Sequence, residues 1–197
     1  MKLEQFTYFY PEAPALASID QPLFARLSYD SQWIAEPKYN GQRLELHCLP
    51  GETPQFWGRH KNRLTYSPSP EILAAIKALH LPGYCILDGE LRHAKVPGIS
   101  HKIMFYDVHA WDWELLLDKP FWFRRDLLED HIFGFPLGFP LQYSTEFRKH
   151  FDVVIRDPEL EGLVMKRLDG KLALGRKAAV TSTWMIKVRR ESGRYRF

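Results

Sequence analysis

The chain has 197 residues, of which 45% are hydrophobic and 26% are charged. These proportions are typical of a soluble globular protein, and the length is enough for one sizeable domain with its own core. The longest apolar run is far too short to span a membrane, and no signal peptide precedes the first acidic residues. The net charge of only +3 excludes a strong polycation, so any binding of nucleic acid must depend on where the charges gather.

The first 30 residues contain three prolines, Pro11, Pro14 and Pro22, which interrupt any regular pattern. We predict that residues 1–30 are irregular and wrap around the domain.

Alternating apolar and polar residues, or short apolar runs rich in β-formers, predict strands along the rest of the chain. The predicted strands span residues 31–35, 44–48, 55–58, 63–66, 84–91, 103–108, 162–167 and 184–188. Helices are predicted over 68–80 and 118–132, each with a proline near its start, and over 146–154. Strands outnumber helices and do not alternate strictly with them, which predicts an α+β fold in a single domain over residues 1–197.

Both cysteines, Cys48 and Cys85, lie within apolar runs that read as strands. This placement predicts buried, reduced thiols in a cytoplasmic protein, rather than a disulfide or a metal site.

The stretch from Glu36 to Arg43 places Lys38 in a short turn between two predicted strands. Such a turn offers backbone N–H groups, Gly41 allows close approach of the backbone, and Arg43 adds a planar cation. A phosphate ester could be held there while the Lys38 amine attacks its phosphorus. The alternative is a hairpin turn that contains a lysine without using it.

Five further motifs follow in order along the chain. They are Trp57-Gly58-Arg59, Leu87-Asp88-Gly89-Glu90-Leu91, Met104-Phe105-Tyr106-Asp107-Val108, Glu161-Gly162-Leu163-Val164-Met165-Lys166 and Met185-Ile186-Lys187-Val188-Arg189. Together with the Lys38 stretch, this series resembles that of the ATP-dependent DNA ligases, which are covalent nucleotidyltransferases like the RNA ligases and mRNA-capping guanylyltransferases. The resemblance runs from about Trp33 to Arg190. It implies the nucleotidyltransferase (ATP-grasp-like) fold, in which two antiparallel sheets flanked by helices enclose a nucleotide cleft.

The resemblance implies that Lys38 attacks the α-phosphate of ATP, expels pyrophosphate and holds AMP through a phosphoramidate. A free lysine is almost fully protonated at neutral pH, so neighbouring cations would have to lower the pKa of the attacking amine. Lys166, Lys187 and Arg189 are the residues expected to do so and to contact the α-phosphate.

The same resemblance assigns the nucleotide contacts. Glu90 is expected to hold the ribose hydroxyls, Glu36 to contribute to nucleotide binding, and Arg43 to lie near the ribose and the nick. Tyr106 is expected to stack on adenine, with an ordinary core aromatic as the alternative, whereas Phe105 on the opposite face of its strand is expected in the core.

The remaining implied roles concern metal and nucleic acid. Glu161 is the expected ligand of Mg²⁺, with Mn²⁺ as a substitute, because a hard cation needs oxygen donors and uses few protein ligands. Arg59 is expected to grip the 5′-phosphate of the strand to be joined, and Asp88 to support a turn. The basic residues that follow Arg59 either reinforce this grip or solvate a loop tip: His60, Lys61 and Arg63.

Three features depart from the family pattern. Asn40, an expected nucleic-acid contact, stands where most DNA ligases have aspartate; this removes a charge beside the nucleophile, keeps a hydrogen-bonding oxygen and puts the final joining step in doubt. Arg189 replaces a usual lysine, and the chain ends soon after it, so the family's oligonucleotide-binding domain is expected to be absent. The basic residues from Lys187 to Phe197 form either a phosphate-binding edge or a solvated tail.

We therefore weigh three functions. The first is a polynucleotide ligase that seals nicks in a duplex through lysyl-AMP, with DNA expected as the substrate before RNA or a hybrid. Such a ligase is expected to be a monomer without a membrane partner. It would act in the cytoplasm, including the host cytoplasm if a phage or virus encodes it. The second is an mRNA-capping guanylyltransferase. The third is a nucleic-acid end-binding module that keeps the fold without turnover.

Overall fold

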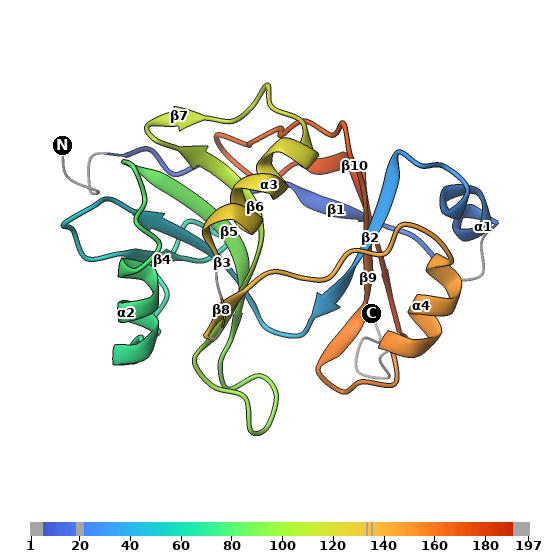
Figure 1. The fold of residues 1–197 in the computed structure, drawn as a ribbon, viewed down its shortest axis with the longest axis horizontal. Coiled ribbons are helices and arrows are strands. Elements are labelled where there is room, and N and C mark those ends of the chain that lie inside the picture. Colours follow the sequence, from blue (N-terminus) through green and yellow to red (C-terminus); the bar gives the residue numbers. More distant parts are fainter. Residues whose placement is uncertain (1–5, 19–21, 133, 135, 191–197) are drawn as a thin grey trace.

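In a computed structural model, residues 6–18, 22–132, 134 and 136–190 are described, and their strands form two sheets that lie side by side (Figure 1). One sheet has the order β1-β10-β9-β2, with bounds Ala13–Leu16, Thr181–Arg189, Leu160–Arg167 and Trp33–Tyr39. The other has the order β4-β3-β5-β6-β7, with bounds Gln55–Trp57, Gln42–Cys48, Cys85–Arg92, Lys102–Trp111 and Glu114–Leu115, and β8 (Leu137–Gly138) also pairs with β6. The predicted α+β class is confirmed.

The two predicted antiparallel sheets are present, and each also contains one short parallel pair. β1 runs parallel to β10, and β8 runs parallel to β6. Both are short strands that arrive from distant parts of the chain, and each pairs with a strand that would otherwise offer unpaired backbone groups there.

Residues 1–30 are not irregular throughout, which corrects the expectation drawn from the prolines. Within the described part, β1 forms between Pro11 and Pro22, and α1 (Leu23–Ser28) begins directly after Pro22. A proline before the first helical turn is compatible with a helix, because the first N–H groups of a helix have no partner within it.

The other predicted helices are present in shortened form. They are α2 (Pro70–Lys77), α3 (Phe121–His131) and α4 (Phe147–Val154). Ser69 caps α2 by accepting a hydrogen bond from the backbone N–H of Ile72. The second predicted hairpin is wrong: β4 forms, but its partner over residues 63–66 is reduced to one bridge between Trp57 and Arg63.

Each sheet has its own apolar core. α2 and α3 cover the sheet that contains β3, β5 and β6, and Phe105 and the buried, unpaired Cys48 and Cys85 lie in the strands of that sheet, as predicted (Figure 1). α1 and α4 pack against the other sheet through Phe24, Phe147 and Phe151. No helix among the described residues is long and apolar enough to cross a membrane.

The two sheets are joined where the chain passes from β2 to β3. These strands belong to different sheets, so the predicted turn over 36–43 shrinks to Asn40 and Gly41, and Lys38 lies within β2. A Cβ atom on Gly41 would lie 2.6 Å from the carbonyl oxygen of Leu91 and 2.7 Å from Cγ of Glu90. The crossing therefore requires a glycine and brings Lys38 to the junction between the sheets.

We expect the change Gly41→Ala to lower the free energy of unfolding by about 1–3 kcal/mol, because the added methyl group must push β5 aside. Urea denaturation measures this loss. Gly138→Ala is the matched control, since its Cβ would meet only the flexible end of Met104 at 3.4 Å. Equal effects of the two changes would contradict the close approach at Gly41.

Candidate active site

Lys38 and Glu161 form the centre of the candidate site. β2 and β9 are antiparallel neighbours, with Lys38 opposite Gly162, and the Lys38 Nζ lies 2.5 Å from Oε2 of Glu161. The two side chains are 23% and 26% exposed, so the amine is held in place yet open to a ligand. The structure thus brings the predicted nucleophile and the predicted metal ligand into direct contact.

Glu90 reaches the same place from the other sheet. It lies on β5 opposite Arg43 of β3, and its carboxyl group is close enough to feel the charges of Lys38, Arg43 and Glu161. Burial raises the pKa of Glu90 to about 7, and the two cations only partly oppose this. Glu90 therefore titrates near neutral pH, where it can change from a hydrogen-bond donor to a charged acceptor.

The raised pKa makes Glu90 a source of instability at neutral pH. The folded-state pKa of Glu90 lies above the ordinary value of 4.5. The contribution of Glu90 to the free energy of unfolding is therefore fully present below pH 4.5 and is lost as the pH rises through about 7. Glu90→Gln resembles the protonated form, so we expect it to be more stable than the parent at pH 8, by up to about 3 kcal/mol. The advantage should shrink at pH 5. Urea unfolding at both pH values tests this, and an advantage independent of pH would contradict it.

A group of cations surrounds this centre. Burial lowers the pKa of Lys187, and so do the positive charges of four neighbours: Arg189, Lys38, Arg59 and Arg43. Lys187 and Arg189 are adjacent on one side of β10 because side chains two residues apart share a face of a strand. Five predicted site residues are therefore brought together from β2, β3, β10 and the turn after β4, as a binding site for several phosphate oxygens would require.

Arg43 is anchored by partners on two sides. Its Nε and Nη2 donate to the Asp88 carboxylate at 3.0 and 2.6 Å, and its Nη1 donates to the carbonyl oxygen of Glu12. Asp88, expected to support a turn, instead lies buried in the middle of β5 and orients Arg43. Its bidentate pairing fixes the plane of the guanidinium group.

A buried chain of charges continues behind Asp88, formed by residues that were not among the predicted site residues. His109 lies 3.4 Å from Asp88 through Nε2 and 2.9 Å from Glu45 through Nδ1. Burial alone would lower the pKa of His109, but the two carboxylates raise it to about 10, so the imidazole is charged at neutral pH. Alternation along β3 could have placed Arg43 and Glu45 on one face, but that His109 faces them from β6 depends on the pairing of the strands.

Glu36 and Lys166, both predicted to contact the nucleotide, are paired with each other. Their side chains are almost fully buried, and Nζ of Lys166 lies 2.7 Å from Oε2 of Glu36 and donates to the Tyr106 carbonyl oxygen at 2.8 Å. Arg125 contacts the other carboxylate oxygen of Glu36 at 3.2 Å. Tyr106 is half-buried, with Nζ of Lys166 5.3 Å from its ring centre and Cζ of Arg43 5.7 Å from it.

Two predicted nucleic-acid contacts, Arg59 and Asn40, lie in the connections that follow β4 and β2. Arg59 is exposed on the turn after β4, where its Nε donates to His60. Asn40 is half-buried at the crossing between the sheets, where its backbone N–H donates to the carbonyl oxygen of Glu159. Two arginines of the predicted basic tail, Arg194 and Arg196, lie outside the described residues.

The residues present fit a Mg²⁺ ion that is bound mainly through phosphate. No group of three or more His, Cys, Asp or Glu side chains in the described ranges could hold a metal by itself. Mg²⁺ commonly uses one or two carboxylates together with water and substrate phosphates. Glu161 supplies such a carboxylate beside the cationic group.

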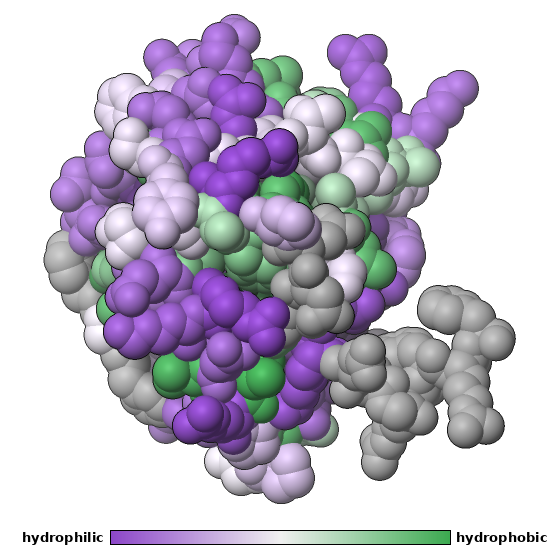
Figure 2. Space-filling model, turned by 90° about the vertical axis from the view of Figure 1, so that its right-hand side faces the viewer, coloured by the Kyte–Doolittle hydropathy of each residue, from purple (hydrophilic) through white to green (hydrophobic). Residues whose placement is uncertain are grey.

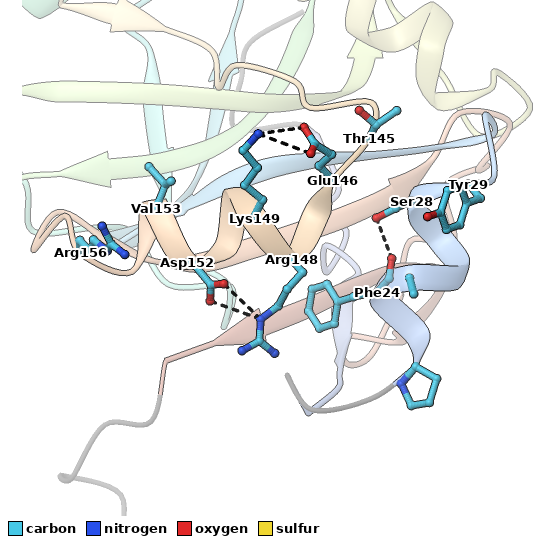
Figure 3. A pocket seen from close by; sticks show the side chains of 12 residues that line it. Phe24, Ser28, Tyr29, Thr145, Glu146, Arg148, Lys149, Asp152, Val153 and Arg156 are labelled. Atoms are coloured by element: carbon cyan, nitrogen blue, oxygen red, sulfur yellow. Dashed lines mark hydrogen bonds and ion pairs between the residues drawn. The ribbon is translucent and has the colours of Figure 1, made fainter.

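A groove lies on the surface away from the candidate site. A groove of about 900 Å³ runs between α1 and α4, and none of the predicted site residues lines it (Figure 3). Charged pairs such as Glu146–Lys149 border it, and the face of the molecule on that side is mostly hydrophilic with small apolar spots (Figures 2 and 3). The groove is therefore not part of the candidate site.

Comparisons with known proteins show a family match and similar folds. Residues 14–97 match the family described as ATP dependent DNA ligase domain. In structure, the chain is similar to mycobacterial DNA ligase D complexed with ATP and MES, with a TM-score of 0.69 and 19% identity over 96% of this chain and 62% of that one. It is also similar to the ligase domain of M. tuberculosis LigD, with a TM-score of 0.65 and 22% identity over 89% of this chain and 59% of that one.

An archaeal ATP-dependent RNA ligase has the same fold, with a TM-score of 0.53 and 15% identity over 91% of this chain and 48% of that one. The comparison with curated proteins found no match. The predicted nucleotidyltransferase fold is confirmed, and the chain spans about three fifths of the length of the two LigD chains.

Proposed function

Since residues 14–97 and the fold support the ATP-dependent ligase family, we propose that this chain takes AMP from ATP onto Lys38 and uses it to seal nicks, preferably in DNA. The observation that carries the proposal is the contact between Lys38 and Glu161, with Glu90 and the cations around Lys187 beside it. These groups come from both sheets, so only the folded chain presents them together.

The first step uses the Lys38 amine as the nucleophile. The amine loses a proton and attacks the α-phosphorus of ATP; an N–P bond forms, the bond to the bridging oxygen of the β-phosphate breaks, and pyrophosphate leaves. Oε2 of Glu161 lies 2.5 Å from Nζ of Lys38, so this carboxylate orients the amine and is the nearest one that can accept its proton. Lys187 and Arg189 would stabilise the negative charge on the phosphate oxygens.

The other site residues fix the nucleotide. Glu90, when ionised, accepts hydrogen bonds from the ribose hydroxyls, and the Tyr106 ring offers a face for adenine. A bound Mg²⁺ would supply neutralisation of phosphate charge, and Glu161 is the residue that would hold it.

The later steps involve nucleic acid. The 5′-phosphate of the nick would bind at Arg59 and attack the lysyl-AMP phosphorus, which frees the amine; a 3′-hydroxyl would then displace AMP and form the phosphodiester bond. Asn40 is neutral where a carboxylate is usual, so we expect the joining step to be slower than adenylation.

A labelling experiment tests the proposal. The protein is incubated with Mg²⁺ and ATP or GTP labelled at the α-phosphate and denatured, and parallel samples receive nicked all-DNA, all-RNA or hybrid duplexes. We expect label from ATP only, and joining of the DNA nick first. Label from GTP would favour a guanylyltransferase, and nick binding without any label would favour an inert end-binding module.

A further inference from the structure

A second cavity lies beside the turn that presents Arg59. It has a volume of about 310 Å³, close to the lower limit for ligand pockets, and therefore suits one planar ring system better than a whole nucleoside triphosphate. Phe6, Tyr8 and Trp57 supply aromatic walls, and Lys61 and Arg63 stand at its border.

The aromatic side chains form a surface on which a flat ligand can stack. The ring centres of Tyr8 and Trp57 are 5.6 Å apart, and Cζ of Arg63 lies 4.5 Å from the centre of a Trp57 ring. Gln55 accepts a hydrogen bond from Nε1 of Trp57, which fixes the indole plane. An aromatic platform bordered by guanidinium and ammonium groups is the combination by which proteins bind unpaired bases and their phosphates.

One buried polar atom in the wall lacks a partner. His47 is only 2% exposed; its Nδ1 pairs with the Tyr84 hydroxyl at 3.0 Å, whereas its Nε2 has no hydrogen bond within the described residues and lies 3.9 Å from Glu45. The nearest polar atom to this nitrogen in the described part of the chain is the equally buried and unpaired Oε2 of Glu45, so the nitrogen faces the buried charges behind the cavity wall and does not itself mark a ligand.

The cavity is joined to the candidate active site through a single turn. The Tyr8 hydroxyl donates to the Gly58 carbonyl oxygen at 2.7 Å, directly before Arg59, and Arg59 is close enough to Lys187 to lower its pKa. Trp57 and Lys61 lie two residues before and after Arg59. A strand with one phosphate on Arg59 would therefore lie beside the cavity.

We propose that this cavity binds one unstacked nucleobase of the nucleic acid substrate, with the adjoining phosphate on Lys61 and Arg63. The inference deepens the proposed function and rests on it. The base would stack against Trp57 and hydrogen-bond to Gln55, so the cavity would select substrates with an unpaired nucleotide beside the break.

Fluorescence of 2-aminopurine tests the inference. The probe is a nicked DNA duplex with one unpaired 2-aminopurine nucleotide next to the nick; 2-aminopurine monophosphate serves in a second arm. Stacking should quench the oligonucleotide probe, and Trp57→Ala should abolish quenching and weaken binding roughly 10- to 100-fold. Trp122→Ala is the matched control, since Trp122 is half-exposed on α3 and does not line the cavity.

Further measurements keep the outcomes separate. Lys61→Ala changes an exposed side chain, so it should fold normally and reduce the dependence of log affinity on log salt by about one unit of slope. Quenching of the mononucleotide alone would assign the base-binding cavity to a free nucleotide. If the parent and Trp57→Ala quench the probe equally, the inference is wrong, even if ATP labels Lys38. If ATP does not label the protein but quenching still depends on Trp57, the proposed function is wrong instead.

Discussion

Replacing Lys38 with alanine will abolish the covalent nucleotide adduct, with a loss of roughly a thousand-fold or more in the rate of labelling by ATP. No other lysine in the described residues combines contact with Glu161 and a place at the junction between the sheets. Lys166 is buried against Glu36, and Lys187 lies on β10, so neither can take over the position of Lys38. Mass spectrometry after incubation with ATP measures the adduct and its position.

Two variants separate chemistry from folding. Lys38→Arg keeps a cation that can pair with Glu161 but has no amine that deprotonates near neutral pH, so it should fold and remain unlabelled. Lys77→Ala removes an exposed lysine on α2 and should be labelled like the parent. Label on Lys38→Ala, or an adduct on another side chain of the parent, would refute the assignment of the nucleophile.

Replacing Arg124 with methionine will lower the free energy of unfolding by about 3–5 kcal/mol, because it leaves the Asp107 carboxylate buried without its partner. Arg124 is fully buried, and its Nε and Nη2 donate to Asp107 at 2.6 and 2.9 Å. Its Nη1 donates to the carbonyl oxygens of Lys119 and Gly170. One side chain therefore ties α3 to β6 and to the segment after β9.

The exposed pair of Arg148 and Asp152 on α4 provides the control. Both side chains are about half exposed, so Arg148→Ala should cost only about 0.5 kcal/mol. Denaturation in urea measures both changes. If Arg124→Met is no more destabilising than Arg148→Ala, the buried pair does not hold α3 in place.

The pH dependence of the Arg124 effect has a defined sign. Although burial opposes it, Arg124 holds the pKa of Asp107 below its usual range. The contribution of this ion pair is therefore present above the ordinary aspartate pKa of about 3.9 and is lost as the pH falls through the lower folded-state value. Between pH 7 and acidic pH, the free energy of unfolding should consequently fall less for Arg124→Met than for the parent.

Local patterns along the chain were enough to predict most elements and the α+β class. Short apolar runs rich in β-formers located β5 and β6, and Pro70 and Pro120 marked the starts of α2 and α3 within one residue, because both signals act over a few neighbouring residues. The placement of Phe105 in the core also followed from alternation along one strand. The motif series around Lys38 and Glu90 was readable because each motif is a short run of residues.

The pairing of the strands is decided only by the tertiary structure. Lys38 and Glu161 are 123 positions apart, and no local pattern shows that β2 pairs with β9 while β3, two residues further on, joins the other sheet. The chain of Arg43, Asp88 and His109 likewise exists only because β3, β5 and β6 pair in one register. Alternation tells which face of a strand a side chain occupies, but partners and register are set by the packing of the whole core, and that packing places the amine, the carboxylates and the cations within reach of one another.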